Sequence, residues 1–495
     1  MRPRCFVSNL PSCRQRECLF EGFFFGAPQL HAPHLHFLMT HPRFSHLAVA
    51  LSCSISALYG QAPVTTTPAA TFAAIAPRID LKDGDTMVFL GDSITHQCLY
   101  TQYVEDYFYT RYPERRIHFH NAGVGGDRAQ NALDRFDEDV AAYKPKVVTI
   151  LLGMNDGAYK GFDQAVFDTY QAGMTTILDK LKELNAVTIP MTPTMHDARA
   201  ARMNGKALEP RDTYYNGVLG LYGAWLREMA QQRGLGFVDM YGPLNQTTLE
   251  QRRTDPNWTM IKDAVHPGPA GQFVMATALI GDIAPKSQVS AVTIFQKEGK
   301  WLSSASNAKV SDLSGGDKIA FTLKANALPW VVPADAEEGY KLMHAGHRMS
   351  NEKLTVRNLA PGSYELTIDG APIGKWTDGQ LAFGVELEEN KLTPQYQQAA
   401  KVAELNKQRN SEAYVKVRGE FAGLKGARNK MNKAVGTPEE ATAKATFETY
   451  HTEMQARVKV LLEKAAALED EIYKNNQPQP HKYELVAVAA VASAK

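Results

Sequence analysis

Cysteine is scarce in this 495-residue chain, and its five cysteines all lie in the first fifth, at Cys5, Cys13, Cys18, Cys53 and Cys98. Most of the folded protein therefore forms no disulfide, and core packing must supply its stability. Net charge is nearly absent too, because 54 Lys and Arg residues face 53 Asp and Glu residues. This balance gives no electrostatic reason to expect nucleic acid or an anionic membrane as the main partner. A small or neutral substrate fits it better.

The apolar run at 47–59 is too short to span a bilayer but has the length of a signal-peptide core. The small residues Gly60 and Ala62 follow it as a cleavage site. Residues 1–62 are therefore predicted to be a leader whose true start is Met39, since a basic, His-rich stretch precedes that methionine. Export to the periplasm or the cell exterior is the expected localisation.

The chain is too long to fold around one ordinary hydrophobic core, so two or more structural units are predicted. Within residues 86–283, apolar strand-like runs alternate with amphipathic helical stretches. This alternation predicts an α/β domain with a parallel five-stranded sheet covered on both faces by helices. The expected strands are 87–90, 117–120, 147–152, 187–191 and 236–240, and the expected helices lie near 97–111, 128–142, 163–184 and 213–233 and after Pro267. Functional loops should lie at the carboxyl ends of these strands.

Two further units are expected after this domain. Residues 286–390 carry short β-leaning segments separated by turns, which predict a small antiparallel sheet or sandwich. Residues 393–475 are rich in Ala, Gln, Glu and Lys and are predicted to form a helical hairpin. Thr393-Pro394 has the order of a helix start, and Thr437-Pro438-Glu439-Glu440 has the order of a capping box that opens the second helix. Residues 476–495 form a tail without a predicted structure.

Four short blocks carry the residues that suit catalysis. Gly91-Asp92-Ser93-Ile94 follows a predicted strand and places a serine near a helix N-terminus, which suits a nucleophile. The block 121–127, Asn-Ala-Gly-Val-Gly-Gly-Asp, follows the next strand, and its glycines allow a tight backbone that turns an N–H toward a ligand. Each block alone also fits an ordinary turn.

The other two blocks complete the set. Gly153-Met154-Asn155-Asp156 follows a third predicted strand, and its asparagine amide can donate to an oxyanion. In Asp263-Ala264-Val265-His266-Pro267, a carboxylate three residues before an imidazole can hold the ring N–H and fix its tautomer. Each again fits a turn or a solvated loop, but all four in this order, three of them at strand ends, are hard to explain as turns.

With these blocks, residues 86–282 resemble the SGNH (GDSL) hydrolase family, which is named after such Ser, Gly, Asn and His residues. The resemblance implies a three-layer α/β/α fold with Ser93 as nucleophile and Asp263 and His266 as its partners. It also implies an oxyanion hole made by the Ser93 and Gly126 backbone N–H groups and the Asn155 amide. The longer sequence around these blocks is similar to that of exported planctomycete-type GDSL-like lipase/acylhydrolase proteins.

The resemblance implies an acyl-enzyme mechanism that needs no metal or organic cofactor. The sequence has no HExxH, paired CxxC or phosphate-loop spacing that would indicate one. The other α/β serine hydrolases place their serine in a GxSxG elbow. Thr95 stands where the last glycine of that elbow would be, which disfavours that fold.

Several further residues have two interpretations. Tyr100, Tyr103 and Tyr107 recur at helical spacing and either line a substrate pocket or, more simply, pack in the core. His196 follows the fourth predicted strand and either touches substrate or is a plain loop histidine.

Three residues beside the blocks are expected to have structural roles. Asp127 and Asp156 adjoin the oxyanion donors and should brace their loops by accepting backbone hydrogen bonds. Cys98 is expected to be buried as a small apolar residue.

The function predicted from these features is removal of small acyl groups, acetyl above all, from carbohydrate. Two alternatives stay open. One is a lipid or aryl esterase, including a lysophospholipase or thioesterase, and the other is a non-catalytic binding or scaffold protein on the same fold. The expected partner is a small-molecule or carbohydrate ester, without nucleic acid or a membrane span, and no oligomeric state is predicted.

Overall fold

The computed structural model describes residues 79, 81–203, 209–284 and 288–488. All of them belong to the second of two compact units, Pro68–Lys495. The leader predicted at residues 1–62 lies outside the described residues.

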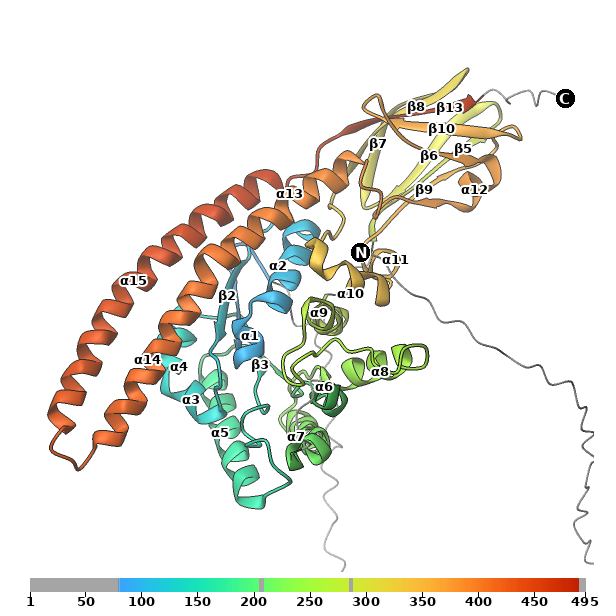
Figure 1. The fold of residues 1–495 in the computed structure, drawn as a ribbon. Coiled ribbons are helices and arrows are strands. Elements are labelled where there is room, and N and C mark those ends of the chain that lie inside the picture. Colours follow the sequence, from blue (N-terminus) through green and yellow to red (C-terminus); the bar gives the residue numbers. More distant parts are fainter. Residues whose placement is uncertain (1–78, 80, 204–208, 285–287, 489–495) are drawn as a thin grey trace, which may run out of the picture. The chain divides into compact units, whose positions relative to one another are not determined.

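A parallel four-stranded sheet in the order β2-β1-β3-β4 forms the centre of the first domain (Figure 1). Its strands are β1 (Thr86–Gly91), β2 (His118–Gly123), β3 (Val147–Leu151) and β4 (Val187–Met191). All five residues of β3 are buried, as expected for a parallel strand that is covered on both faces.

The predicted fifth strand at 236–240 is reduced to one parallel bridge between Met191 and Val238. Around this bridge, Val238 N–H donates to Pro190 O at 3.2 Å and Thr192 N–H donates to Val238 O at 3.1 Å. The next bond of a parallel ladder would need an N–H on Pro190, which proline lacks. The prediction of five full strands was therefore wrong by this one strand.

Helices lie on both sides of the sheet, with α2 packed against α9 and α3 packed against α5. The helices of this domain are α1 (Ser93–His96), α2 (Leu99–Arg111), α3 (Ala129–Asp134), α4 (Phe136–Asp139), α5 (Gln164–Glu183), α6 (Ala198–Met203), α7 (Pro210–Gln232), α8 (Tyr241–Gln251) and α9 (Pro269–Ile283). The three-layer α/β/α fold expected from the sequence is confirmed. The helix expected at 128–142 is broken into α3, α4 and a 3-10 turn.

Two sheets form a β-sandwich, in the orders β11-β10-β13-β8-β7 and β12-β9-β5-β6. The strands are β5 (Gln288–Lys297), β6 (Lys300–Ser306), β7 (Ala308–Ser314), β8 (Lys318–Ala325), β9 (Asn351–Val356), β10 (Ser363–Ile368), β11 (Ala371–Thr377), β12 (Val385–Glu386) and β13 (His481–Val488), and α12 (Asp378–Phe383) lies between β11 and β12. The pairs are antiparallel except β5 with β9. Alternate residues of β10 are buried, as expected for a strand with one face in a core.

The tail supplies an inner strand of this sandwich. β13 lies between β10 and β8, and its Tyr483 and Leu485 are buried in the sandwich core. The β-rich unit is therefore not the continuous stretch 286–390 that the sequence predicted, because it also includes residues 481–488. The sequence of β13 alone predicted no strand, and only its pairing with β10 and β8 identifies it as one.

The segment between β8 and β9 packs on the α/β domain instead of the sandwich. It contains the 3-10 turn Ala334–Ala336, α10 (Glu337–Leu342) and α11 (Ala345–Met349). Trp330 anchors it, since its Nε1–H donates to Tyr103 O at 3.0 Å and its ring lies 4.8 Å from that of Phe273. This part of the predicted β unit belongs to the core of the first domain.

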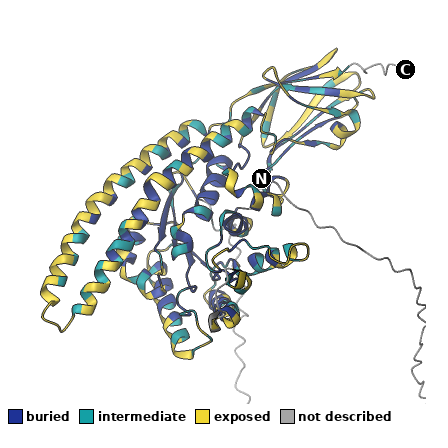
Figure 2. Cartoon of the chain, viewed as in Figure 1, coloured by how far each residue is buried: buried dark blue, intermediate teal, exposed yellow. Residues whose placement is uncertain are grey.

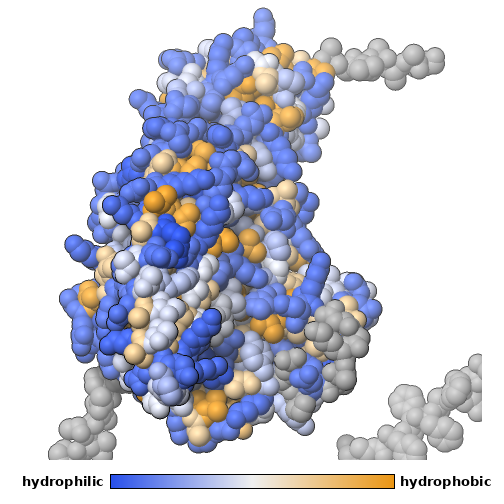
Figure 3. Space-filling view, turned by 60° about the vertical axis from the view of Figure 1, so that its left-hand side comes forward, coloured by the Kyte–Doolittle hydropathy of each residue, from blue (hydrophilic) through white to orange (hydrophobic). Residues whose placement is uncertain are grey.

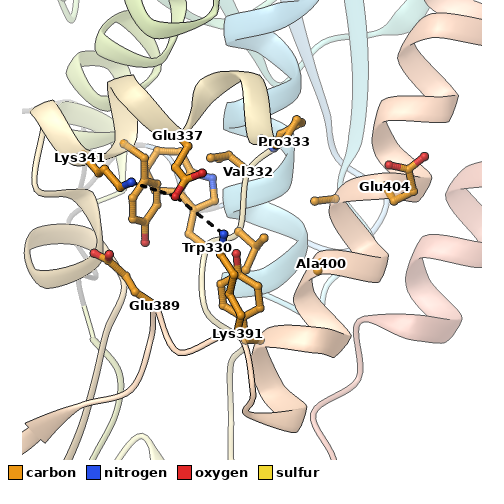
Figure 4. Close-up of a pocket in the computed structure, with 14 residues that line it drawn as sticks. Trp330, Val332, Pro333, Glu337, Lys341, Glu389, Lys391, Ala400 and Glu404 are labelled. Atoms are coloured by element: carbon orange, nitrogen blue, oxygen red, sulfur yellow. Dashed lines mark ion pairs between the residues drawn. The ribbon is translucent and has the colours of Figure 1, made fainter.

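A cavity of about 260 Å³ lies where this segment meets the start of the helical hairpin (Figure 4). Trp330, Tyr340 and Tyr396 contribute to its lining. The Glu337 carboxylate lies 3.0 Å from Lys341 Nζ and 3.8 Å from Lys391 Nζ at its edge. None of the three predicted catalytic side chains lines this cavity.

The helical hairpin consists of α13 (Pro394–Arg409), a π-helical turn (Asn410–Tyr414), α14 (Val415–Ala434) and α15 (Glu440–Asn475). Thr393 caps α13 as predicted, accepting the Tyr396 N–H at 3.2 Å. The capping box predicted at Thr437 was wrong, because α15 begins only at Glu440 and one of the two bonds of the box is missing. The Thr437 hydroxyl accepts the Glu439 N–H at 3.3 Å, but the Glu440 carboxylate accepts the Gly436 N–H at 2.8 Å instead of the Thr437 N–H.

Buried polar contacts hold the hairpin against α2. Arg409 Nη1 and Asn410 Nδ2 donate to Glu105 Oε2 at 3.2 and 2.8 Å. Asn406 Nδ2 donates to Asp106 Oδ1 at 2.8 Å. Figure 2 shows that α15, in contrast to these contacts, is largely exposed along its outer length. The hairpin is therefore docked through specific hydrogen bonds and ion pairs as well as apolar packing.

The face that Figure 3 brings forward is mostly hydrophilic, with apolar side chains in small separate groups. Within the described ranges, no helix combines the length and the apolar character needed to cross a membrane. Some apolar residues of the hairpin pack against one another. Val417 and Phe421 of α14 and Met454 and Val458 of α15 belong to one buried cluster.

Glu352 in β9 leads to a prediction about stability. Its side chain is buried, and neither carboxyl oxygen has a hydrogen-bond partner among the described residues. Burial, followed by the charge of Glu388, raises the pKa of Glu352 from 4.5 to about 8. The stability that its protonated form contributes is full below pH 4.5 and is lost as the pH rises through about 8.

We expect Glu352→Gln to flatten the fall in unfolding free energy across this pH range, because the amide cannot ionise. Urea denaturation at several pH values measures it, with Glu463→Gln, an exposed position on α15, as the matched control. Parallel pH profiles for Glu352→Gln and the unmodified protein would contradict the expectation.

Candidate active site

The serine block follows β1 directly, and close backbone packing requires its glycine. Ser93 is the first residue of α1, and Asp92 caps this helix by accepting the Ile94 N–H at 2.9 Å. A Cβ at Gly91 would lie 2.1 Å from Thr95 Oγ1, and a Cβ at Gly123 would lie 2.3 Å from the backbone N of His96. Only glycine at both positions lets α1 approach the ends of β1 and β2 this closely.

Ser93, His266 and Asp263 form one continuous hydrogen-bonded relay. Ser93 Oγ lies 2.8 Å from His266 Nε2, and His266 Nδ1 lies 2.6 Å from Asp263 Oδ2. With Nδ1–H donating to the carboxylate, Nε2 is left to accept the serine proton. The structure thus brings together three side chains from two blocks that are far apart in the sequence.

Asp263 is held in place by its own turn. Its Oδ1 accepts the backbone N–H groups of Val265 and His266 at 3.0 and 2.7 Å. Burial works to raise the pKa of Asp263, but hydrogen bonds from His266 and Val265 outweigh it and lower that pKa below 3.8. The carboxylate therefore stays ionised at neutral pH, which suits a group that orients an imidazole.

The oxyanion loop, residues 124–127, lies at the end of β2. In the part of the chain that the structure describes, neither the Ser93 N–H nor the Gly126 N–H has a hydrogen-bond partner. Gly126 has a φ of +68°, a left-handed conformation that glycine adopts at no steric cost. Both N–H groups are thus available to a ligand oxygen.

The Asn155 amide faces the same loop. Its Nδ2 donates to Asp127 O at 3.1 Å and to Asp92 Oδ2 at 3.3 Å. The Tyr159 hydroxyl donates to Asn155 Oδ1 at 3.0 Å, which fixes the amide orientation. A substrate oxyanion would compete with the longer of the two Nδ2 bonds, the one to Asp92.

Asp92 connects the serine block with the asparagine block, a role that the sequence did not single out. It is fully buried, and burial, with the nearby charges of Asp156 and Asp127 adding to it, raises its pKa to about 7. One oxygen caps the helix that carries Ser93 and the other accepts from Asn155. This carboxyl therefore fixes two of the expected oxyanion donors relative to each other.

The two acidic residues beside the oxyanion donors are held differently. Asp156 accepts the Ala129 and Gly153 N–H groups at 2.8 and 3.0 Å, which confirms its predicted bracing role. For Asp127 the prediction of backbone bonds was wrong. Its carboxylate accepts from Arg135 Nε at 2.9 Å and pairs with Lys425 Nζ at 2.9 Å. Neither cation was a sequence candidate: Lys425 lies about 300 residues from Asp127, and an ion pair over that distance leaves no local signal.

The remaining candidates lie in the core. Tyr100, Tyr103 and Tyr107 are fully buried, so the packing interpretation is confirmed for all three. His196 is also buried, with its ring 5.6 Å from that of Tyr215. Cys98 is buried beside residues of the hairpin, as expected, and burial raises its pKa to about 12.

Among the residues that the structure describes, no group of three or more His, Cys, Asp or Glu side chains is placed to hold a metal ion.

The model of the GDSL-like lipase/acylhydrolase family matches residues 89–273, the stretch that contains all four blocks. This stretch belongs to the GDSL-like lipase/acylhydrolase family. The chain is accordingly a carboxylic ester hydrolase.

The GDSL-like domain is similar in sequence to an acetylxylan esterase. An acetylxylan esterase of Geobacillus stearothermophilus is 26% identical over 223 residues, which are 40% of this chain and 94% of the esterase. A crystal structure of Axe2, an acetylxylan esterase from the same organism, covers 41% of this chain and 95% of its own at 26% identity, with a TM-score of 0.34.

A third similarity extends beyond the GDSL-like domain. The structure of BT4096, a gut microbial diltiazem-metabolizing enzyme, has a TM-score of 0.71 and 25% identity. It covers 84% of this chain and 100% of its own. The structural similarity therefore extends over the accessory elements of this chain as well as its GDSL-like domain.

We expect Asn155→Ala to lower kcat for an ester by about 10²–10³-fold, the usual loss when one oxyanion donor is removed. Tyr159→Phe should have a smaller effect in the same direction, because it frees the amide without deleting it. Steady-state kinetics measures kcat for both variants, and their melting temperatures show whether they are folded. A full kcat in folded Asn155→Ala would show that its amide does not act on the oxyanion.

Proposed function

We propose that this chain is a serine ester hydrolase that removes small acyl groups, acetyl above all, from carbohydrate. The observation that carries the proposal is the relay from Ser93 Oγ through His266 to Asp263, at 2.8 and 2.6 Å. The likeness of the GDSL-like domain to an acetylxylan esterase over 94% of that enzyme supports the substrate class.

Acylation begins at Ser93. His266 Nε2 takes the hydroxyl proton as Oγ forms a bond to the ester carbonyl carbon, and Asp263 stabilises the imidazolium. The Ser93 and Gly126 N–H groups and the Asn155 amide hold the tetrahedral oxyanion. Each such donor lowers the barrier by roughly 3–4 kcal/mol.

Release of the two products follows from the same groups. The imidazolium returns its proton to the alkoxy oxygen of the leaving alcohol as the C–O bond breaks, which leaves an acyl-Ser93 ester. His266 then removes a proton from water, which attacks the acyl carbonyl. Collapse of the second tetrahedral species releases the acid and restores the Ser93 hydroxyl.

We further propose that the protein is exported, so that it meets acylated polysaccharide outside the cytoplasm. The apolar run at 47–59 and the small residues after it support this. Mass spectrometry of the N-terminus of protein recovered outside the cytoplasm tests it, and the expected result is a chain that begins just after residue 62. Peptides from residues 1–38 in that fraction would contradict the proposal.

The substrate class is tested with p-nitrophenyl esters of increasing acyl length and with acetylated xylooligosaccharide, measuring acid release. We expect the highest kcat/KM on acetate, a steep fall with chain length, acetate release from the oligosaccharide, and no turnover by Ser93→Ala.

Other outcomes identify the two alternatives. A preference for long acyl chains would favour the lipid or aryl esterase. Absence of turnover on every ester by folded protein would favour a binding or scaffold role.

A further inference from the structure

The C-terminal hairpin reaches the oxyanion loop. Val124, the first residue of this loop, is fully buried in a cluster with Val417, Phe421 and Leu424 of α14. The next residue of α14 is Lys425. The packing of α14 thus places the Lys425 side chain on the loop that carries the expected oxyanion donor Gly126.

The Lys425 ammonium contacts the residues on both sides of Gly126. Its Nζ donates to Gly125 O at 3.1 Å and lies 2.9 Å from Asp127 Oδ1. A Cβ built on Gly126 would lie 3.6 Å from the same Nζ. The side chain is only 20% exposed, so water screens this charge incompletely.

Arg418 supports the loop from the same helix, through a second buried charge network. Its Nη1 and Nη2 donate to Asp139 at 2.7 and 2.9 Å, and Asp139 also pairs with Arg135. Arg135 Nε donates to Asp127 Oδ2 at 2.9 Å and its Nη2 donates to Gly91 O at 3.2 Å. The network therefore runs from α14 to the oxyanion loop and to the strand end before Ser93.

The hairpin adds positive charge at this place. The GDSL-like domain contributes the carboxylates of Asp127 and Asp139 and one guanidinium, Arg135. Arg418 pairs with Asp139 and Lys425 pairs with Asp127, so α14 adds two positive charges that face these carboxylates. Positive charge added beside the oxyanion loop favours a transition state whose oxygen becomes negative.

We propose that Lys425 is a positioning residue for the ester hydrolysis proposed above: it fixes the backbone around Gly126 and supplies positive charge at the oxyanion loop. The inference rests on that proposed function. It makes the hairpin, which lies outside the stretch matched by the GDSL-like family, part of the working active site.

The test compares Lys425→Met with Lys425→Arg in the full chain, using p-nitrophenyl acetate as substrate. Lys425→Met keeps the aliphatic stem and removes the charge, and we expect kcat to fall about 10- to 100-fold with KM within about twofold, since the ground-state carbonyl carries little charge. Lys425→Arg keeps the charge and the N–H donors and should restore most of kcat. Lys430→Ala, an exposed lysine of α14, serves as the matched control with unchanged kinetics.

The outcomes separate this inference from the proposed function. Turnover that is lost in Ser93→Ala but unchanged in Lys425→Met leaves the proposed function standing and overturns the role of Lys425. A lower melting temperature with an unchanged kcat marks a docking contact only and also overturns it. No turnover by the unmodified protein overturns both proposals. If Lys425→Met does not fold, Lys425→Gln replaces it, because the uncharged amide still donates to Gly125 O and should show the same loss of kcat.

Discussion

The buried ion pair between Arg418 and Asp139 is the contact on which the rest of the arrangement depends. Both side chains are fully buried, and both guanidinium nitrogens that face the carboxylate donate to it. Breaking such a pair by removing one partner typically costs about 3–5 kcal/mol, since the other charge stays buried. Through Asp139 the pair fixes Arg135, and through Arg135 it fixes Asp127 and the end of β1. One desolvated contact thus couples a helix near the end of the chain to the loop beside the nucleophile.

Local patterns in the sequence predicted the parts of the fold whose causes are local. The strands β1 to β4 lie where the sequence predicted them, β1, β2 and β3 end at functional blocks, and Thr393 caps its helix through its own hydroxyl. The failures have specific physical reasons. Pro190 cannot donate to the ladder that a fifth strand needs, and the Glu440 carboxylate accepts the Gly436 N–H instead of the Thr437 N–H that a capping box needs.

The candidate site divides in the same way. Ser93, Asp263 and His266 could be singled out because each block has its own residue pattern, and the structure places their side chains in one relay. Lys425 and Arg418 could not, since a lysine or an arginine on an amphipathic helix looks the same whether it faces water or a loop 300 residues earlier. Long-range ion pairs become visible only when the packing of α14 against the domain is known.

Strand β13 constrains the order in which the chain can fold. It is an inner strand of its sheet, between β10 and β8, yet the whole hairpin separates it from β12 in the sequence. During synthesis, β8 and β10 must wait with unpaired edges until both long helices have left the ribosome. Exposed edges of this kind are templates for pairing with other chains. A nascent chain that stalls within α15 would therefore present two unpaired strand edges, and only the synthesis of β13 beyond the hairpin covers them.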